Sequence, residues 1–399
     1  MSLLYTFLGV SLFLNLLFIY FDIYPYLRKR FVKEKYCNKE SIDSYAKKVF
    51  RASKLMAFSN KTFMKMTERN DIISGISLFI KGKKFNEFKK YSYPRAFLFL
   101  GSLKYASIKE DKKYFLEVKG RFDELYISED GKPIFNIDKV DQTVFAQVAL
   151  LLYKETSEIK YKNYIDIFYN YLQSLKSTDG EILYRKSSRV QYVDLLGMIC
   201  PFLIEYGLEF NNESALNLAY THMNYWIKKG LDNQSHLPFH CVHLESGTKV
   251  GPANWGRGIG WYGIALAYIV ANTNNKNNPF HEIFSFELNT LFNTLNKLKN
   301  KDSLWGQFLG NPKGNGLYFD ASASTTFLYM TALSKGQPNF QSAICNYTTI
   351  DGFIDFTSGD TEGINQYSRA FSKSEFSQGM LLLYLSELYK NKLTQTKKE

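Results

Sequence analysis

Asp194 is the residue of this 399-residue chain whose surroundings most clearly suggest chemistry. It lies in RVQYVDLLGMICPF (189–202), where Leu195, Met198 and Phe202 recur at three- and four-residue spacing and predict the core-facing side of a helix. A carboxyl group at the start of such a stripe loses hydration, which raises its pKa toward the range of a general acid. The same position also suits a helix cap, because Asp often precedes an apolar periodic segment.

Two further acids, Asp138 and Asp141, stand in NIDKVDQTVF just before the apolar run that begins at Val144. Carboxylates at the amino-terminal end of a helix are stabilised by the helix dipole and by capping. This is the simplest interpretation of the pair, and the pattern alone does not indicate catalysis.

Three histidines, His236, His240 and His243, follow one another in HLPFHCVHLESG. Spacings of four and three would suit metal ligands on one face of a helix. Pro238 and the Glu-Ser-Gly that follows predict a loop or a strand instead. We therefore expect one hydrogen-bonding histidine here and no metal site.

The segment NWGRGIGWYGIALA (254–267) places Arg257 between two glycines and between Trp255 and Trp261. Indole rings stack on sugars, and a guanidinium can clamp a carboxylate through two hydrogen bonds, so this segment is a candidate binding site for an acidic sugar. The glycines do not form a dinucleotide fingerprint, because the preceding strand and the later glycine are missing. A helix start with a core tryptophan is the alternative.

A coarse repeat of helix pairs must position these residues. Two copies are clear, at 96–122 and 144–172, and fainter copies occur at 195–227, 261–298, 322–347 and 377–393. A helix pair cannot bury its apolar face alone, so the pairs must stack as a solenoid or close into a ring. Polar and glycine-rich connectors, including 245–260 and 310–316, favour a closed toroid with its loops around a central cleft.

The first residues predict a membrane anchor. Residues 3–21 give 19 positions without a charge, about the length of a transmembrane helix. Basic residues follow, so the positive-inside rule predicts a single-pass protein with a cytoplasmic domain. The expected organisation is an anchor at 1–27, a basic juxtamembrane segment at 28–45, one helical domain at 46–393 and a charged tail at 394–399.

The amino-acid composition limits the classes of ligand and partner that we expect this chain to bind. The net charge of +12 comes largely from dispersed lysines, which suits anionic lipid, an acidic saccharide or solubility. We expect no nucleic acid partner, because the basic residues form no recognised binding motif. The 4 cysteines show no ligand spacing, which favours a reducing compartment. No cofactor is predicted, and the sequence does not indicate an oligomeric state.

Several motifs in order resemble one known family. The segment 189–207 is similar to a conserved aspartate, methionine and proline-phenylalanine segment of the unsaturated uronyl hydrolases, glycoside hydrolase families 88 and 105. NWGRGIGW resembles their W-x-R-G-x-G-W helix start, and LPFHCVHLESG resembles the histidine-bearing strand before it. VDQTVF and FDASAS match two further family segments. The resemblance runs from about residue 90 to 390.

The resemblance implies an all-α (α/α)6 barrel, preceded here by the predicted transmembrane helix. It also implies an enzyme that removes a 4,5-unsaturated uronic acid from the non-reducing end of an oligosaccharide by hydrating the double bond. Carried over by position, Asp194 is the general acid/base and Asp141 the second acid of the pocket. The substrate-binding residues implied are Tyr192, His240, Trp255, Arg257 and Trp261.

Two alternatives remain open. Tyr192 stands where the family usually has tryptophan, and Tyr184 where a related segment carries histidine. These changes and the predicted anchor also fit a catalytically impaired sugar-binding or scaffolding relative, tethered to a membrane and serving surface-polysaccharide assembly. A sugar epimerase on the same toroid would need two catalytic histidines, and His240 and His243 are close together in sequence for that role.

Overall fold

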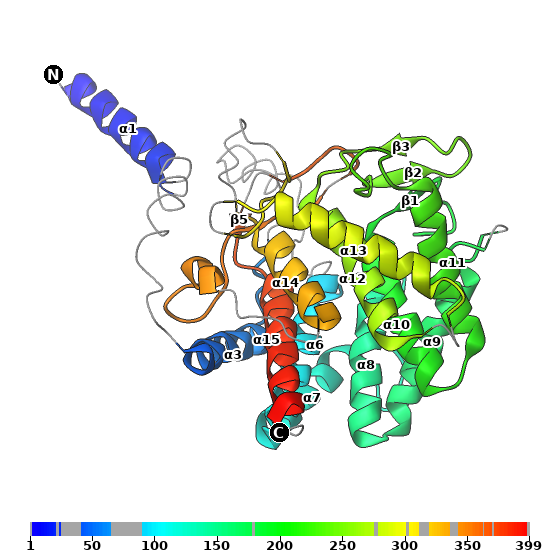
Figure 1. The fold of residues 1–399 in the computed structure, drawn as a ribbon. Helices are drawn as coiled ribbons and strands as arrows, with labels where there is room; N and C mark the ends of the chain where they lie inside the picture. Colours follow the sequence, from blue (N-terminus) through cyan, green and yellow to red (C-terminus); the bar gives the residue numbers. More distant parts are fainter. Residues whose placement is uncertain are drawn as a thin grey trace.

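The computed structural model shows a largely helical chain (Figure 1). It describes residues 2–20, 24, 41–64, 90–177, 180–274, 278–300, 303–310, 319–335, 342–361, 363–368 and 371–396. Residues 28–40 of the predicted basic juxtamembrane segment (28–45) and residues 311–316 of the predicted connector (310–316) lie outside these residues.

Six helices of the described chain form an inner ring. They are α6 (Tyr93–Ile108), α8 (Thr143–Thr156), α10 (Asp194–Glu209), α12 (Gly256–Asn272), α14 (Ala321–Lys335) and α15 (Glu375–Thr396). Each packs against the next along the chain, and α15 packs against α6, which closes the ring. The predicted closed toroid of helix pairs is therefore confirmed, and the solenoid alternative is wrong.

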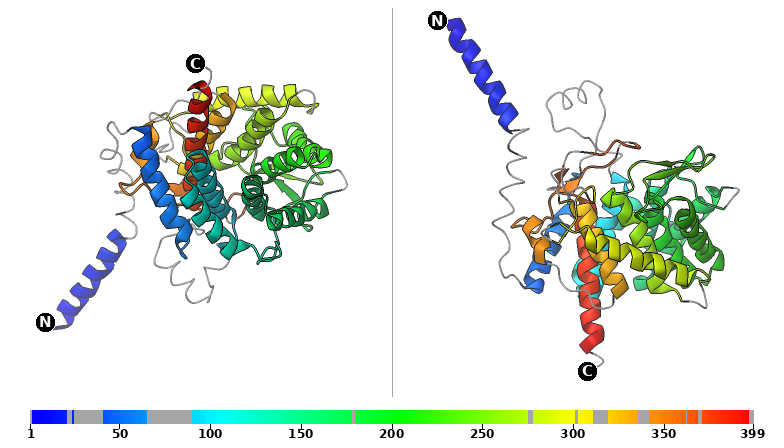
Figure 2. Two further views of the ribbon diagram at one scale, coloured as in Figure 1. Left: turned by 90° about the horizontal axis from the view of Figure 1, so that it is seen from below. Right: turned by 45° about the horizontal axis from the view of Figure 1, so that its top comes forward.

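An outer layer packs against this ring, as the two turned views in Figure 2 show. It consists of α3 (Ile42–Phe58), α7 (Lys112–Tyr126), α9 (Ile159–Ser174), α11 (Glu213–Lys229) and α13 (His281–Lys297). Four of these helices directly follow an inner helix, as the repeats predicted, and the short 3-10 helix η4 (Ser342–Tyr347) follows α14. The partner of α15 is α3, from the opposite end of the described chain.

The closing contact between α6 and α15 depends on two glycines. A side chain at Gly101 would meet the backbone of Gly379, and a side chain at Gly379 would meet the backbone of Phe97. Because neither residue has a Cβ, the two helix backbones can approach closely there.

The extent to which a helix is buried depends on whether it lies in the inner ring or in the outer layer. In α12 every residue from Gly256 to Ile269 is buried, because an inner helix contacts the barrel interior on one side and the outer layer on the other. Outer helices keep a polar face, and α3, α7 and α11 begin at side-chain caps. The side chains of Asp111 and Asn212 accept backbone hydrogen bonds at the starts of α7 and α11, both at 3.0 Å.

Short strands cover one end of the barrel. β1 (Val190–Tyr192), β2 (Cys241–His243) and β3 (Lys249–Val250) form an antiparallel sheet in that order, with Tyr192 paired to Cys241. β4 (Thr357–Ser358) pairs with β5 (Phe371–Ser372). In Figure 1 the first sheet lies at the end of the barrel away from the carboxyl terminus. The strand or loop predicted for the histidine segment is confirmed.

The predicted transmembrane helix is not supported. Helix α1 covers Ser2–Phe18, 17 residues. Among the described residues, no helix combines the length and the apolar character needed to cross a bilayer.

Candidate active site

Asp194 is the first residue of α10 and is separated from β1 only by Val193. The cap position belongs to Val193, and no side chain makes a capping hydrogen bond there, so the helix-cap interpretation of Asp194 is wrong. The backbone N–H of Val193 donates to the His240 carbonyl at 2.9 Å, which fixes the turn into the helix. Within the described structure, Oδ2 of Asp194 is buried and has no hydrogen-bond partner.

The environment of Asp194 favours its protonated form. Burial raises the pKa of its carboxyl group to about 7, and the negative charge of Asp360 raises it further. The positive charge of Arg257, a backbone hydrogen bond and the indole N–H of Trp261 lower this pKa in part. The side chain nevertheless keeps 19% of its surface exposed. A desolvated acid that a ligand can still reach, with a pKa near neutrality, is suited to donating a proton.

Asp141 lies in η3 (Val140–Gln142), the single turn that leads into α8. Its Oδ2 is 3.0 Å from Nζ of Lys139, and both side chains are buried. Burial raises the pKa of Asp141 to about 6, although Lys139 counteracts this effect. Asp141 is thus largely ionised at neutral pH and can stabilise positive charge.

His240 precedes β2 and lies next to Asp194. Its Nε2 is 3.6 Å from Oδ2 of Asp194, too long for a hydrogen bond, and its Nδ1 is 2.7 Å from the Tyr367 hydroxyl. Burial lowers the pKa of His240 to about 4, so the ring is neutral at pH 7. It therefore adds no positive charge beside Asp194. His236 lies in a turn and His243 in β2.

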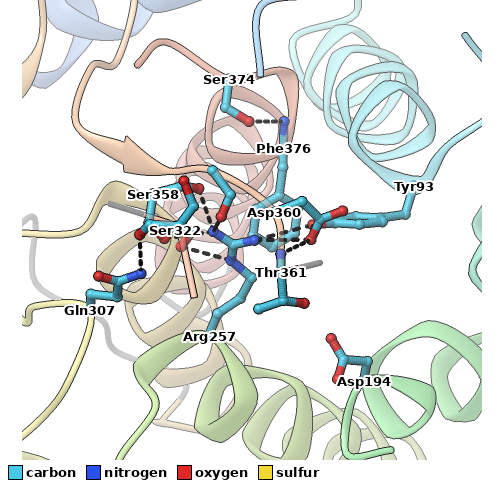
Figure 3. Close-up of polar contacts among 12 residues, drawn as sticks. Tyr93, Asp194, Arg257, Gln307, Ser322, Ser358, Asp360, Thr361, Ser374 and Phe376 are labelled. Carbon is cyan, nitrogen blue, oxygen red and sulfur yellow. Dashed lines mark hydrogen bonds and ion pairs between the residues drawn. The ribbon is translucent and has the colours of Figure 1, made fainter. Parts of the chain in front are cut away.

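Arg257 is not presented to a ligand as the sequence suggested. The side chain is 1% exposed, and its guanidinium donates to protein oxygens from Nε, Nη1 and Nη2. The partners are the Ser322 hydroxyl (3.1 Å), the Tyr93 hydroxyl (3.3 Å), Asp360 Oδ1 (3.4 Å), the Ser358 hydroxyl (2.6 Å), the Ser358 carbonyl and the Gly359 carbonyl (3.1 Å) (Figure 3). Arg257 therefore ties the 358–360 loop to α12 and does not clamp a carboxylate.

We expect Arg257→Lys to destabilise the protein by about 2–4 kcal/mol, because the lysine ammonium group cannot donate hydrogen bonds to all of the buried oxygen atoms that the planar guanidinium contacts. Chemical denaturation measures the loss. Arg257→Lys should change the affinity for a uronyl ligand and for its neutral amide by the same factor. A selective loss for the charged ligand would show instead that Arg257 reads the carboxylate.

The two tryptophans also belong to the core. Trp261 is fully buried, with its ring centroid 5.6 Å from Tyr93 and 5.0 Å from Phe376. Trp255 is 2% exposed and packs on His240 and Tyr367. Neither indole offers a free face for stacking, so the predicted sugar platform is wrong, and the alternative of a helix start with core tryptophan is correct.

The aromatic faces at the site come from tyrosines. Tyr192 and Tyr184 are half-buried, with ring centroids 5.5 Å apart, and Tyr192 lies 5.8 Å from the His240 ring. Burial raises the pKa of Tyr184, and the charges of Asp141, Asp194 and Asp360 raise it further. Tyr184 is therefore within electrostatic reach of all three carboxylates.

Sequence reasoning missed Asp360, Tyr93 and Lys139. Asp360 follows β4 in SGDTEG, which reads as an ordinary turn. Tyr93 starts α6, and its hydroxyl donates to Asp360 at 3.1 Å across 267 residues of sequence. The FDASAS motif was noticed, and its acid Asp320 caps α14 by accepting from the Ser322 N–H at 2.8 Å.

The ring of helix pairs, with carboxyl groups at the starts of some inner helices, has the architecture of a six-hairpin barrel. The chain belongs to Glycosyl Hydrolase Family 88, whose sequence model matches residues 59–391.

Solved structures agree on the fold. A family 105 glycoside hydrolase of C. acetobutylicum ATCC 824 is similar to this chain, with a TM-score of 0.66 at 20% identity, covering 79% of this chain and 98% of that one. A possible family 105 member from Salmonella enterica gives TM-score 0.71 at 15% identity, covering 89% and 96%. An unsaturated glucuronyl hydrolase specific for heparin gives 0.66 at 15% identity, covering 90% and 98%.

Proposed function

We propose that this glycoside hydrolase removes a 4,5-unsaturated uronic acid from the non-reducing end of an acidic oligosaccharide by hydrating the C4–C5 double bond, with Asp194 as the general acid/base. The observation that carries the proposal is the combination of position, pKa and exposure found at Asp194. It begins an inner helix, its pKa is raised to about 7 by burial, and 19% of its side chain remains exposed. The similarity to a glucuronyl hydrolase specific for heparin supports the substrate class.

The chemistry follows from the two acids. Asp194 donates its proton to C4 of the unsaturated ring, and the positive charge that develops at C5 and the ring oxygen is stabilised by ionised Asp141. A water molecule adds at C5 and returns a proton to Asp194. The resulting hemiketal opens and releases the remaining sugar. One proton-transferring carboxyl group suffices, so the spacing rule for two glycosidase carboxylates does not apply.

Turnover can be followed directly. The substrate double bond is conjugated with the carboxylate, so hydration removes its ultraviolet absorbance. We expect the purified protein to abolish this absorbance for an unsaturated uronyl disaccharide and to leave the saturated disaccharide intact. An intact unsaturated disaccharide after long incubation would contradict the proposal.

The pH dependence should be bell-shaped. Asp194 must be protonated, so kcat/KM should fall as pH rises through about 7, the raised pKa of this carboxyl group. Asp141 must be ionised, so kcat/KM should fall as pH drops below about 6. Initial rates at low substrate concentration measure both limbs. A profile that stays flat between pH 5 and 9, a range chosen to bracket both limbs roughly, would contradict these assignments.

A sugar-binding relative without turnover is the second candidate. Its support is that Tyr192, beside His240, and Tyr184, beside Tyr192, stand where the family usually carries tryptophan and histidine. Such a protein would bind the same disaccharide in calorimetry without consuming the double bond.

A further inference from the structure

Asp360 is a third carboxylate at the site. It follows β4, in the loop whose two preceding residues, Ser358 and Gly359, accept hydrogen bonds from Arg257. Three donors converge on Oδ1 of Asp360: Tyr93 Oη (3.1 Å), Arg257 Nη1 (3.4 Å) and the backbone N–H of Thr361 (3.1 Å). These are the partners of an ionised carboxylate held in one place.

The carboxylate of Asp360 is held in one position but remains partly exposed. Its side chain keeps 21% of its surface exposed, whereas that of Arg257 keeps 1%. Figure 3 draws Asp360 and Asp194 on the same side of the Arg257 guanidinium, with Tyr93 beyond Asp360. Arg257 is thus the buried anchor, and Asp360 is the partly exposed end of the ion pair.

The negative charge of Asp360 raises the pKa of Asp194. After burial, Asp360 is the strongest influence that raises the pKa of Asp194, and Arg257 is the strongest that lowers it. The same negative charge acts on Asp141 and Tyr184. The ionisable groups around Asp194 are Tyr93 on α6, Arg257 on α12, Tyr184, Tyr192 on β1, His240, Cys241 on β2, Asp360 and Tyr367.

We propose that Asp360 is a positioning residue for catalysis: anchored by Arg257 and Tyr93, it places a negative charge on the same side of the guanidinium as Asp194 and so opposes ionisation of the general acid. The inference rests on the proposed role of Asp194 as the general acid. Because Arg257 acts in the opposite direction, neutralising Asp360 would remove one of the two carboxylates, with Asp320, that balance the guanidinium charge near Asp194. Asp194 would then lose its proton at neutral pH and could no longer supply it.

The test is Asp360→Asn in the full chain, labelled with carbon-13 at the aspartate carboxyl groups. Asp194 is assigned as the signal that disappears in Asp194→Asn. We expect the titration midpoint of Asp194 to fall by about one pH unit or more in Asp360→Asn. Asp360→Glu should restore most of the wild-type midpoint. Glu245→Gln, which removes one exposed negative charge from the β2–β3 hairpin, should leave it unchanged.

Asp360→Ser provides a second variant if the amide disturbs folding, because its hydroxyl is small and still accepts a hydrogen bond. It should lower the midpoint as well. An Asp194 midpoint equal to wild type in a folded Asp360→Asn or Asp360→Ser protein would overturn the proposal.

Turnover separates this inference from the proposed function. If both are right, the alkaline limb of kcat/KM moves to lower pH in step with the titration of Asp194. A general loss of rate with an unmoved limb would mean that Asp360 is only structural. A lowered NMR midpoint in a protein that never consumes the double bond would refute the proposed reaction and leave the effect of Asp360 on Asp194 standing.

Discussion

Asp194→Asn is expected to lower kcat on an unsaturated uronyl disaccharide by about 10²–10⁴-fold, the typical contribution of a general acid. The amide has nearly the same shape as the carboxyl group but cannot donate an acidic proton to C4. Because Oδ2 of Asp194 has no hydrogen-bond partner in the described structure, the substitution breaks no internal contact at that atom. Loss of double-bond absorbance measures kcat, and thermal melting should be close to wild type.

Glu209→Gln is the matched control, since it neutralises an exposed acid at the other end of the same helix. It should change kcat by less than about twofold, as expected for a surface charge far from the reaction. Asp194→Asn with wild-type turnover would exclude Asp194 as the proton donor.

Asp141→Asn is expected to lower kcat by about 10²-fold, because a neutral amide stabilises the developing positive charge less well than a carboxylate. It should also destabilise the protein by about 3–5 kcal/mol, since Lys139, whose Nζ is 3.0 Å from Asp141, would become a buried cation without its counterion. Turnover and denaturant unfolding are measured on the same preparation.

The double variant Lys139→Met, Asp141→Asn separates the two effects. Removing both charges together should recover most of the lost stability, because no buried charge is left unpaired. It should not recover kcat. Recovery of both would mean that Asp141 serves only to neutralise Lys139.

The sequence could predict the barrel because its repeated apolar pattern reflects local packing. The pairs at 96–122 and 144–172 coincide with α6–α7 and α8–α9. The pairing of α3 with α15 was not predictable in this way, because it joins distant parts of the chain and depends on ring closure.

The candidate site was predictable only where a residue's role depends on its own helix. Asp194 stands out because a carboxyl group begins an apolar helix, and the structure places it there. Arg257 was misjudged because its acceptors lie about 65 to 164 residues away in sequence, on Ser322, Ser358 and Tyr93. Flanking glycines show that the segment packs tightly, but they do not show what fills the space.

The most direct test of the proposed reaction is proton NMR of an unsaturated uronyl disaccharide incubated with the protein in deuterium oxide. Hydration predicts that the vinyl H4 signal disappears, that one deuterium appears at C4 of the released open-chain product, and that Asp194→Asn slows both changes together. Release of the second sugar with the vinyl signal intact would show ordinary glycosidic cleavage and would contradict hydration of the double bond.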